Sequence, residues 1–238
     1  MESFSSFLVE DGWTPHGLDK CFYKWVEDGV IQVVLGIHVG DVFCGGKGKF
    51  YESALERPQN RFSFGSWSNA QETTITYCGM EIAQKSDGSL FLCHERFALG
   101  IDEVVLTQER KGDTLAETTT EEKRRMRQTL GSLSWRATQS ASWLLAPVSL
   151  LQEAVESGRA CDVSAVNKLV RLQRKYFDRG LYFPCLNGDV TVVTFTDASW
   201  ATRVDGSSQG GQITILAPKG ILNGEKTPFC VLVGQAEG

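Results

Sequence analysis

The hydrophobic pattern of this 238-residue chain changes twice, and these changes constrain its fold more than any other feature. Residues 20–93 contain short β-rich runs separated by turn signals. Residues 118–180 carry apolar side chains at helical spacing, and residues 181–216 are β-rich again. Hairpins combined with a block of helices are typical of the α+β class. We therefore expect antiparallel sheets with helices in an α+β fold.

The first β-rich part begins with two runs joined by the turn signal Glu27-Asp28-Gly29. A helix is expected over about Lys49–Arg57, and Pro58 should end it or begin its last irregular turn because proline lacks the amide hydrogen. The tight turn Ser86–Ser89 precedes a return strand, and His94–Ile101 could form a short helix. The strands expected here are Phe22–Val26, Val30–Ile37, a further strand up to residue 44, Thr73–Ala83 and Leu90–Cys93.

The middle of the chain predicts three helices. Thr119 and Glu122 have the spacing of a capping box, and the helix that they start should run to about Thr138. A second helix is expected from the N-cap candidate Ser142 to Ser157, and a third from the N-cap candidate Asp162 to Gly180. The apolar stripe of the third helix consists of Val166, Leu169, Val170, Gln173, Tyr176 and Phe177, interrupted only by the glutamine.

The last part predicts the strands Leu181–Cys185, Val190–Phe195 and Gln212–Leu216. Together they would form a three-stranded fragment with an exposed edge. We therefore expect this part of the chain to stop partway through a domain.

Charge is distributed unevenly along the chain. The net charge of −5 gives no chain-wide basic character, yet residues 121–180 hold 11 basic and 6 acidic residues. The ordinary interpretation, favoured on charge alone, is a solvated helix face. The functional one is a face that follows a phosphate backbone. The candidate nucleic-acid-binding residues are Lys168, Arg171, Arg174 and Lys175.

Cysteine usage and hydropathy bear on the compartment. The seven cysteines are odd in number and form no C-x-x-C pair, so they are interpreted as small buried thiols of an intracellular protein. The longest apolar stretch, Val30–Val39, is too short and too interrupted to span a bilayer. The start of the chain lacks the features of a secretory signal. We expect an intracellular protein, cytoplasmic or nuclear, that is not secreted and has no membrane partner.

Two aspartates are candidate metal ligands. Asp41 follows Gly40 at a strand-to-strand turn, where a carboxylate is also ordinary turn chemistry. Asp197 lies near the end of an apolar strand, flanked by Val193 and Phe195. An aspartate on a buried strand needs a cation or donors to offset its desolvation. For Asp197, a metal-ligand role and a capping role therefore stay equally open.

Taken in order, several segments resemble the pol region of copia-type retrotransposons. Val33–Gly46 resembles the strand–turn–strand that carries Tyr-Val-Asp-Asp in that family, and Val193–Trp200 resembles the opening of its RNase H domain. The other matching segments are Gly12-Trp13 with Leu18–Lys24, Phe50–Phe64, Tyr77–Ile82, Leu130–Trp135 and Ala137-Thr138.

This resemblance implies a reverse transcriptase with RNase H, which uses Mg²⁺ held by several carboxylates. Asp41 would be a catalytic metal ligand of the polymerase, and Asp197 the first catalytic metal ligand of RNase H. Gly40 stands where the family has the first aspartate of its pair, and the early-strand aspartate would lie before residue 1. The resemblance therefore implies a catalytically defective fragment in which Mg²⁺ binding is doubtful.

The resemblance also implies a domain organisation and a partner. Residues 1–105 would be the C-terminal part of a polymerase palm, 106–180 a helical thumb or connection, and 181–238 a truncated RNase H-like domain. A thumb grips the template–primer, so an RNA–DNA hybrid is the expected partner and the basic residues of 121–180 would contact its backbone. Two alternatives stay open: a non-catalytic nucleic-acid-binding module of retroelement origin, and an inert relic.

Overall fold

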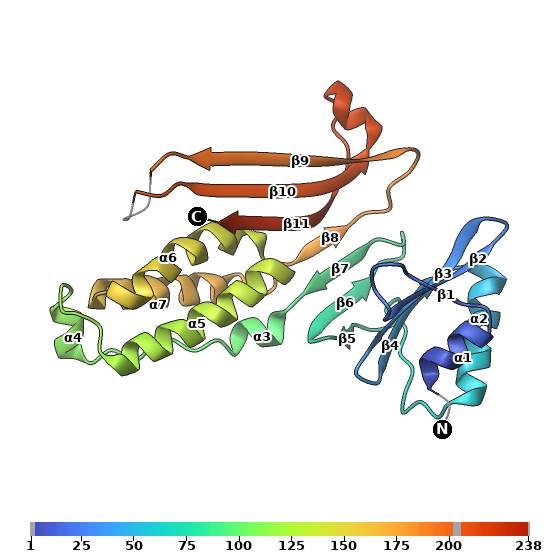
Figure 1. Cartoon of the computed structure of the whole chain (residues 1–238), viewed down its shortest axis with the longest axis horizontal. Coiled ribbons are helices and arrows are strands. Elements are labelled where there is room, and N and C mark those ends of the chain that lie inside the picture. The colour runs from blue at the N-terminus through green and yellow to red at the C-terminus, as the bar shows by residue number, and fades with distance from the viewer. Residues whose placement is uncertain (1–2, 202–205, 238) are drawn as a thin grey trace. The chain divides into compact units, whose positions relative to one another are not determined.

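The computed structural model describes residues 3–201 and 206–237 (Figure 1). The chain divides into two compact units, Met1–Asn69 and Ala70–Gly238. Each unit combines helices with sheets in which all strand pairs are antiparallel. The expected α+β class, with antiparallel sheets and helices, is therefore confirmed.

The first unit is a four-stranded sheet in the order β1-β2-β3-β4. Its core contains Leu8, Trp13, Tyr23, Val33, Leu35 and Ala54. The predicted hairpin and following strand of residues 20–44 are confirmed. The elements are α1 (Phe4–Glu10), β1 (Thr14–Pro15), β2 (Phe22–Glu27), β3 (Val30–His38), β4 (Asp41–Gly46) and α2 (Gly48–Arg61).

Pro58 does not end the helix, but it begins the last turn, as the second alternative predicted; that turn is regular and not irregular. Pro58 is buried within α2, which continues to Arg61. A proline in the last turn removes only its own N–H bond to the preceding turn. Its carbonyl oxygen still accepts a hydrogen bond from the Phe62 N–H at 2.9 Å, so the helix closes normally.

The second unit begins with a sheet in the order β5-β6-β7-β8. Its strands are β5 (Ile75–Tyr77), β6 (Met80–Gln84), β7 (Leu90–Cys93) and β8 (Leu181–Phe183). Residues 73–83 were expected as one strand, but they form a hairpin. Cys78 and Gly79 have φ values of 52° and 76°, as a two-residue hairpin turn of type I′ requires. Both residues of such a turn need a positive φ, and Gly79 adopts one without a steric penalty.

Strand β8 corrects a second expectation. Residues 181–185 were grouped with the C-terminal strands, but β8 pairs with β7, with Leu92 opposite Leu181. A Cβ atom on Gly180 would lie 1.9 Å from the Leu92 carbonyl oxygen. The approach of the chain to β7 therefore depends on a residue without a side chain.

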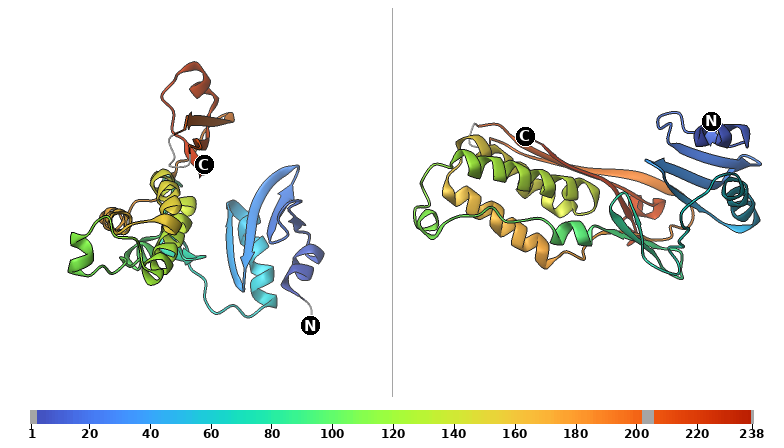
Figure 2. Two further views of the ribbon diagram at one scale, coloured as in Figure 1. Left: turned by 60° about the vertical axis from the view of Figure 1, so that its left-hand side comes forward. Right: turned by 90° about the horizontal axis from the view of Figure 1, so that it is seen from below.

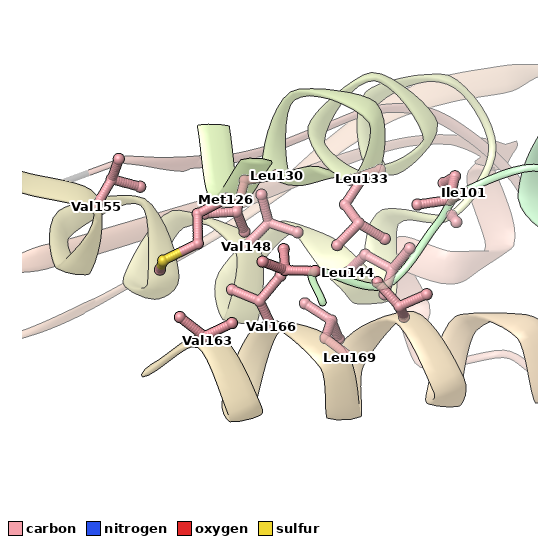
Figure 3. Packing of buried hydrophobic residues seen from close by; sticks show 14 of the residues in the cluster. Ile101, Met126, Leu130, Leu133, Leu144, Val148, Val155, Val163, Val166 and Leu169 are labelled. Atoms are coloured by element: carbon pink, nitrogen blue, oxygen red, sulfur yellow. The ribbon is translucent and has the colours of Figure 1, made fainter. Parts of the chain in front are cut away.

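Helices of the second unit enclose its main core (Figure 3). Met126, Leu130, Leu133, Val163 and Val166 are almost completely buried there. The elements are α3 (Glu95–Leu99), α4 (Gln108–Gly112), α5 (Thr120–Gln139), the 3₁₀ turn η1 (Ser142–Leu144), α6 (Leu145–Ser157) and α7 (Ala160–Lys175). The short helix expected within 94–101 is confirmed as α3.

The predicted N-cap is confirmed for α5 but is wrong for α6 and α7. The capping box of α5 is confirmed, because the Thr119 hydroxyl accepts from the Glu122 N–H and the Glu122 carboxylate accepts from the Thr119 N–H. Ser142 starts a 3₁₀ turn instead of capping α6. Arg159 is the N-cap of α7, and the Asp162 carboxylate accepts from its N–H at 2.7 Å. Helix α7 ends at Lys175, five residues before the expected end at Gly180.

The C-terminal sheet has the order β11-β10-β9. Its strands are β9 (Val190–Ser199), β10 (Gln209–Pro218) and β11 (Cys230–Glu237), with the 3₁₀ turn η2 (Lys219–Asn223) between the last two. Figure 2 shows these long strands running beside the helices of the same unit. Gly234 of β11 approaches Leu145 of α6 closely. Among the described residues β9 pairs only with β10, so it is an edge strand.

Candidate nucleic-acid interface

Asp41 stands at the tip of the β3–β4 hairpin of the first unit. Val39 and Gly40 form the two-residue turn, with φ values of 45° and 98°, and His38 is the register partner of Asp41. A positive φ is uncommon for a β-branched residue such as valine. The hairpin register therefore holds Asp41 at a fixed, exposed place at the start of β4.

Asp197 lies on β9 opposite Gly211. Its carboxylate accepts a hydrogen bond from the Ala198 N–H at 2.9 Å. The expectation of a buried strand is wrong at this place, because Asp197 is exposed and the neighbouring Phe195 is 57% exposed. An edge strand leaves these side chains in water, so desolvation does not require a cation at Asp197.

Each aspartate has to be considered with the surroundings that its own unit provides. Asp41 belongs to the first unit and Asp197 to the second. Within residues 3–201 and 206–237, no group of three or more His, Cys, Asp or Glu side chains is arranged to hold a metal ion. Among the described side chains, the several carboxylates that the resemblance implies for Mg²⁺ are not grouped around either aspartate.

The four predicted cations lie on α7, and two of them are held by acids from another segment. Arg171 forms an ion pair with Glu103. Arg174 pairs with Asp102 at 3.4 Å and donates to the Ile101 carbonyl oxygen. Lys168 and Lys175 are exposed, and the Lys175 ammonium lies 5.6 Å from the centroid of the Tyr176 ring.

Hydrogen bonds of Asn167 explain why Asp102 and Glu103 lie beside the arginines of α7. The side-chain amide of Asn167 accepts from the Val104 N–H and donates to the Val104 carbonyl oxygen, both at 2.7 Å. The two bonds fix the segment around Val104 along α7 and place Asp102 and Glu103 beside the basic residues. Because these acids precede residue 121, a count of charges over 121–180 overstates the free positive charge of this face.

Three exposed arginines of α5 are paired with acids in a similar way. Arg124 and Arg125 both donate to Glu121, and these hydrogen bonds lower the pKa of that exposed carboxyl to about 2. Arg127 pairs with Glu156 of α6. Exposed pairs of this kind contribute little to stability, but they compete with any phosphate for the same guanidinium groups.

Arg136 is a buried cation that the sequence pattern did not identify. Its side chain is completely buried in the last turn of α5. It donates to the Gln173 carbonyl and side-chain oxygens and to the carbonyl oxygens of Tyr176 and Phe177. The glutamine that interrupts the α7 stripe is therefore an acceptor for this guanidinium, and Arg136 caps the C-terminal end of α7.

His94 is the second buried ionisable group of the same region. Its Nδ1 lies 2.7 Å from the Ser140 hydroxyl oxygen, and its ring packs edge-on against Trp135 with centroids 4.6 Å apart. Burial lowers the pKa of His94; the charge of Glu81 opposes this shift, and the charge of Arg136 adds to it. The imidazole is therefore neutral near pH 7.

The expected burial of the cysteines is only partly correct. Cys93 and Cys230 are buried, Cys44 is half-buried, and burial raises the pKa of each of these thiols. The other four are exposed, namely Cys21, Cys78, Cys161 and Cys185. Apolar neighbours in the sequence do not ensure burial, because turn and helix-surface positions are set by the fold. All seven cysteines are free thiols.

Comparisons with protein-family models, curated proteins and solved structures found no match to this chain. In the described residues, no helix combines the length and the apolar character needed to cross a bilayer. What the structure defines is a mixed α+β protein of two units, with an exposed aspartate on an antiparallel strand in each and a partly neutralised basic helix in the second.

Proposed function

We propose that this protein derives from a copia-type reverse transcriptase with RNase H and binds the backbone of an RNA–DNA hybrid without polymerase activity. The observation that carries the proposal is the placement of the two aspartates. Asp41 stands at the tip of a hairpin, and Asp197 lies on the first strand of an antiparallel sheet. The sequence resemblance implies a carboxylate in both settings.

The loss of polymerase activity in this proposal rests on Gly40. A glycine precedes Asp41 at the hairpin tip where the resembling family has a carboxylate, and its φ of 98° suits the turn. A two-metal site needs several carboxylate ligands to hold both ions. Asp41 alone does not supply them.

Hybrid binding is assigned to α7. Its exposed cations are Lys168, Arg171 and Lys175, and phosphate contacts of this kind are independent of sequence and sensitive to salt. Arg171 has to exchange Glu103 for a phosphate, so its contribution is smaller than that of an unpaired cation. Lys168 forms no ion pair among the described residues and can contact a phosphate directly.

Fluorescence anisotropy with a labelled RNA–DNA hybrid tests the binding. Each phosphate contact that is removed should lower the slope of log K against log salt by about 0.9. Lys168→Ala should weaken binding and lower the slope, whereas Lys20→Ala, an exposed lysine of the first unit, should do neither. Glu103→Gln should tighten binding because it releases Arg171. Hybrid binding that none of these changes affects, or no binding at low salt, would refute the assignment to α7.

Primer extension tests the proposed loss of polymerisation. An RNA template, a DNA primer and either Mg²⁺ or Mn²⁺ should give no incorporation. Incorporation that disappears on Asp41→Asn would show that the hairpin aspartate still supports synthesis and would overturn this part of the proposal.

A further inference from the structure

A hollow in the second unit is lined by aromatic side chains from three separate segments. Trp143 comes from η1, Tyr182 from β8, and Phe229 from the residue just before β11. The hollow has a volume of about 430 Å³. Tyr182 and Phe229 are 43% and 49% exposed, so parts of these rings face solvent.

Two cations flank this aromatic wall. The Lys85 ammonium lies 4.9 Å from the centroid of the Tyr182 ring. The Arg179 guanidinium lies 3.8 Å from the centroid of Tyr176, and Tyr176 packs edge-on against Trp143 with centroids 6.0 Å apart. Each cation is therefore linked to a ring of the wall, directly or through one aromatic neighbour.

The residues that line the hollow include no acid in the described part of the chain. Its wall is mainly apolar, and the charge linked to it by ring contacts is positive. Exposed rings with cations beside them are the combination by which proteins bind single-stranded nucleic acids, since bases stack on the rings and phosphates meet the cations. A proline-rich peptide would also fit an aromatic groove, but it would leave the positive charge unmatched.

We propose that this hollow is a binding site for single-stranded nucleic acid, with bases stacked on Tyr182 and Phe229 and the backbone held by Lys85 and Arg179. The site does not include Lys168 or Arg171 and takes a different form of nucleic acid, although Lys175 of α7 also contacts the Tyr176 ring. It does not depend on the retroelement origin proposed above.

Fluorescence anisotropy of the full chain with a labelled oligothymidylate of about 12 nucleotides, a length within the usual range of site sizes, tests this site. Tyr182→Ala and Phe229→Ala should each weaken binding at least about fivefold, the equivalent of the lower limit for one stacked base. The matched control is Phe195→Ala, which removes a ring that is 57% exposed on β9 and should leave binding unchanged.

The charge part is tested with the same probe. Lys85→Ala and Arg179→Ala should each weaken binding and lower the salt slope by about 0.7, the value for a single-strand phosphate contact. Lys168→Ala should not affect the oligothymidylate, whereas it should weaken hybrid binding. The two proposals can therefore fail independently.

Three results would overturn the proposal: no oligothymidylate binding at low salt, equal losses for Phe195→Ala and Tyr182→Ala, or Tyr182-dependent binding of a proline-rich peptide without binding of the oligonucleotide. Far-UV circular dichroism and thermal melting of each variant show whether it is folded. Because Tyr182 and Phe229 are about half-exposed, both variants are expected to melt close to the parent protein.

Discussion

Replacing Arg136 by methionine should destabilise the second unit more than any surface substitution. The side chain is fully buried, and its guanidinium donates to the carbonyl oxygens of Gln173, Tyr176 and Phe177 at 3.0–3.1 Å. Methionine fills similar space but has no donor, so the last carbonyl groups of α7 lose their partners. Burial lowers the pKa of Arg136, but arginine remains charged in proteins.

The size of this effect follows from the acceptors left behind. A buried polar group without a partner costs about 1–3 kcal/mol, and breaking a buried charged contact costs about 3–5 kcal/mol. The carbonyl groups of Tyr176 and Phe177 are only partly buried and can bind water in the variant. We therefore expect the free energy of unfolding to fall by about 3–4 kcal/mol.

Urea unfolding followed by far-UV circular dichroism measures this loss. The matched control is Arg125→Met on the same helix, which removes an exposed pair with Glu121 and should cost no more than about 0.5 kcal/mol. If Arg136→Met does not fold, Arg136→Lys is the alternative, because it keeps the charge but not the planar guanidinium with its several N–H donors. It should lower the free energy of unfolding by an intermediate amount of about 1–3 kcal/mol. A loss below about 1 kcal/mol for Arg136→Met would refute the reasoning.

Three further predictions concern stability. Because burial lowers the pKa of His94, the unfolded chain binds a proton that the folded chain does not, between that lowered value and about 6.5. The free energy of unfolding should therefore fall as the pH drops through this window. If the His94→Gln variant shows the same dependence of the free energy of unfolding on pH as the parent protein, this prediction is wrong. Gly180→Ala places a Cβ atom 1.9 Å from the Leu92 carbonyl oxygen, so its melting temperature should drop sharply. In the control Gly131→Ala, the added Cβ atom on α5 has no neighbour within 4 Å, so this variant should be stabilised by about 0.5–1 kcal/mol. Similar shifts of the melting temperature in both variants would contradict the predicted clash at Gly180. Thr119→Ala should cost about 1 kcal/mol in urea unfolding because it removes the cap of α5, whereas Thr119→Ser should retain most of it; equal losses would argue against the cap.

The features that were predicted correctly depend on residues close together in the chain. The β2–β3 hairpin follows from two β-rich runs around Glu27-Asp28-Gly29, and the start of α5 follows from the spacing of Thr119 and Glu122. The hydrophobic pattern likewise determined the α+β class. In each case the interacting groups are a few residues apart, so the sequence alone contains the geometry that joins them.

The incorrect predictions have the opposite character. Nothing near residue 181 indicates that β8 joins β7, a strand about ninety residues earlier, and the glycine that permits it was visible only as a helix end. The helical spacing of Arg171 indicates a basic face but not its ion pair, because the partner Glu103 is 68 residues away. Phe195 and Val193 suggested a buried strand, but β9 lies at a sheet edge.

By itself, the sequence determined the kinds of element, their order and the local capping, because these depend on interactions within a few residues. Only the tertiary structure decided which charges remain available, which polar groups are buried together and which aromatic rings face one hollow. Trp143, Tyr182 and Phe229 have no spacing that relates them in the chain. They share a wall because pairing of β8 with β7 and packing of β11 beside the helices bring three distant segments together.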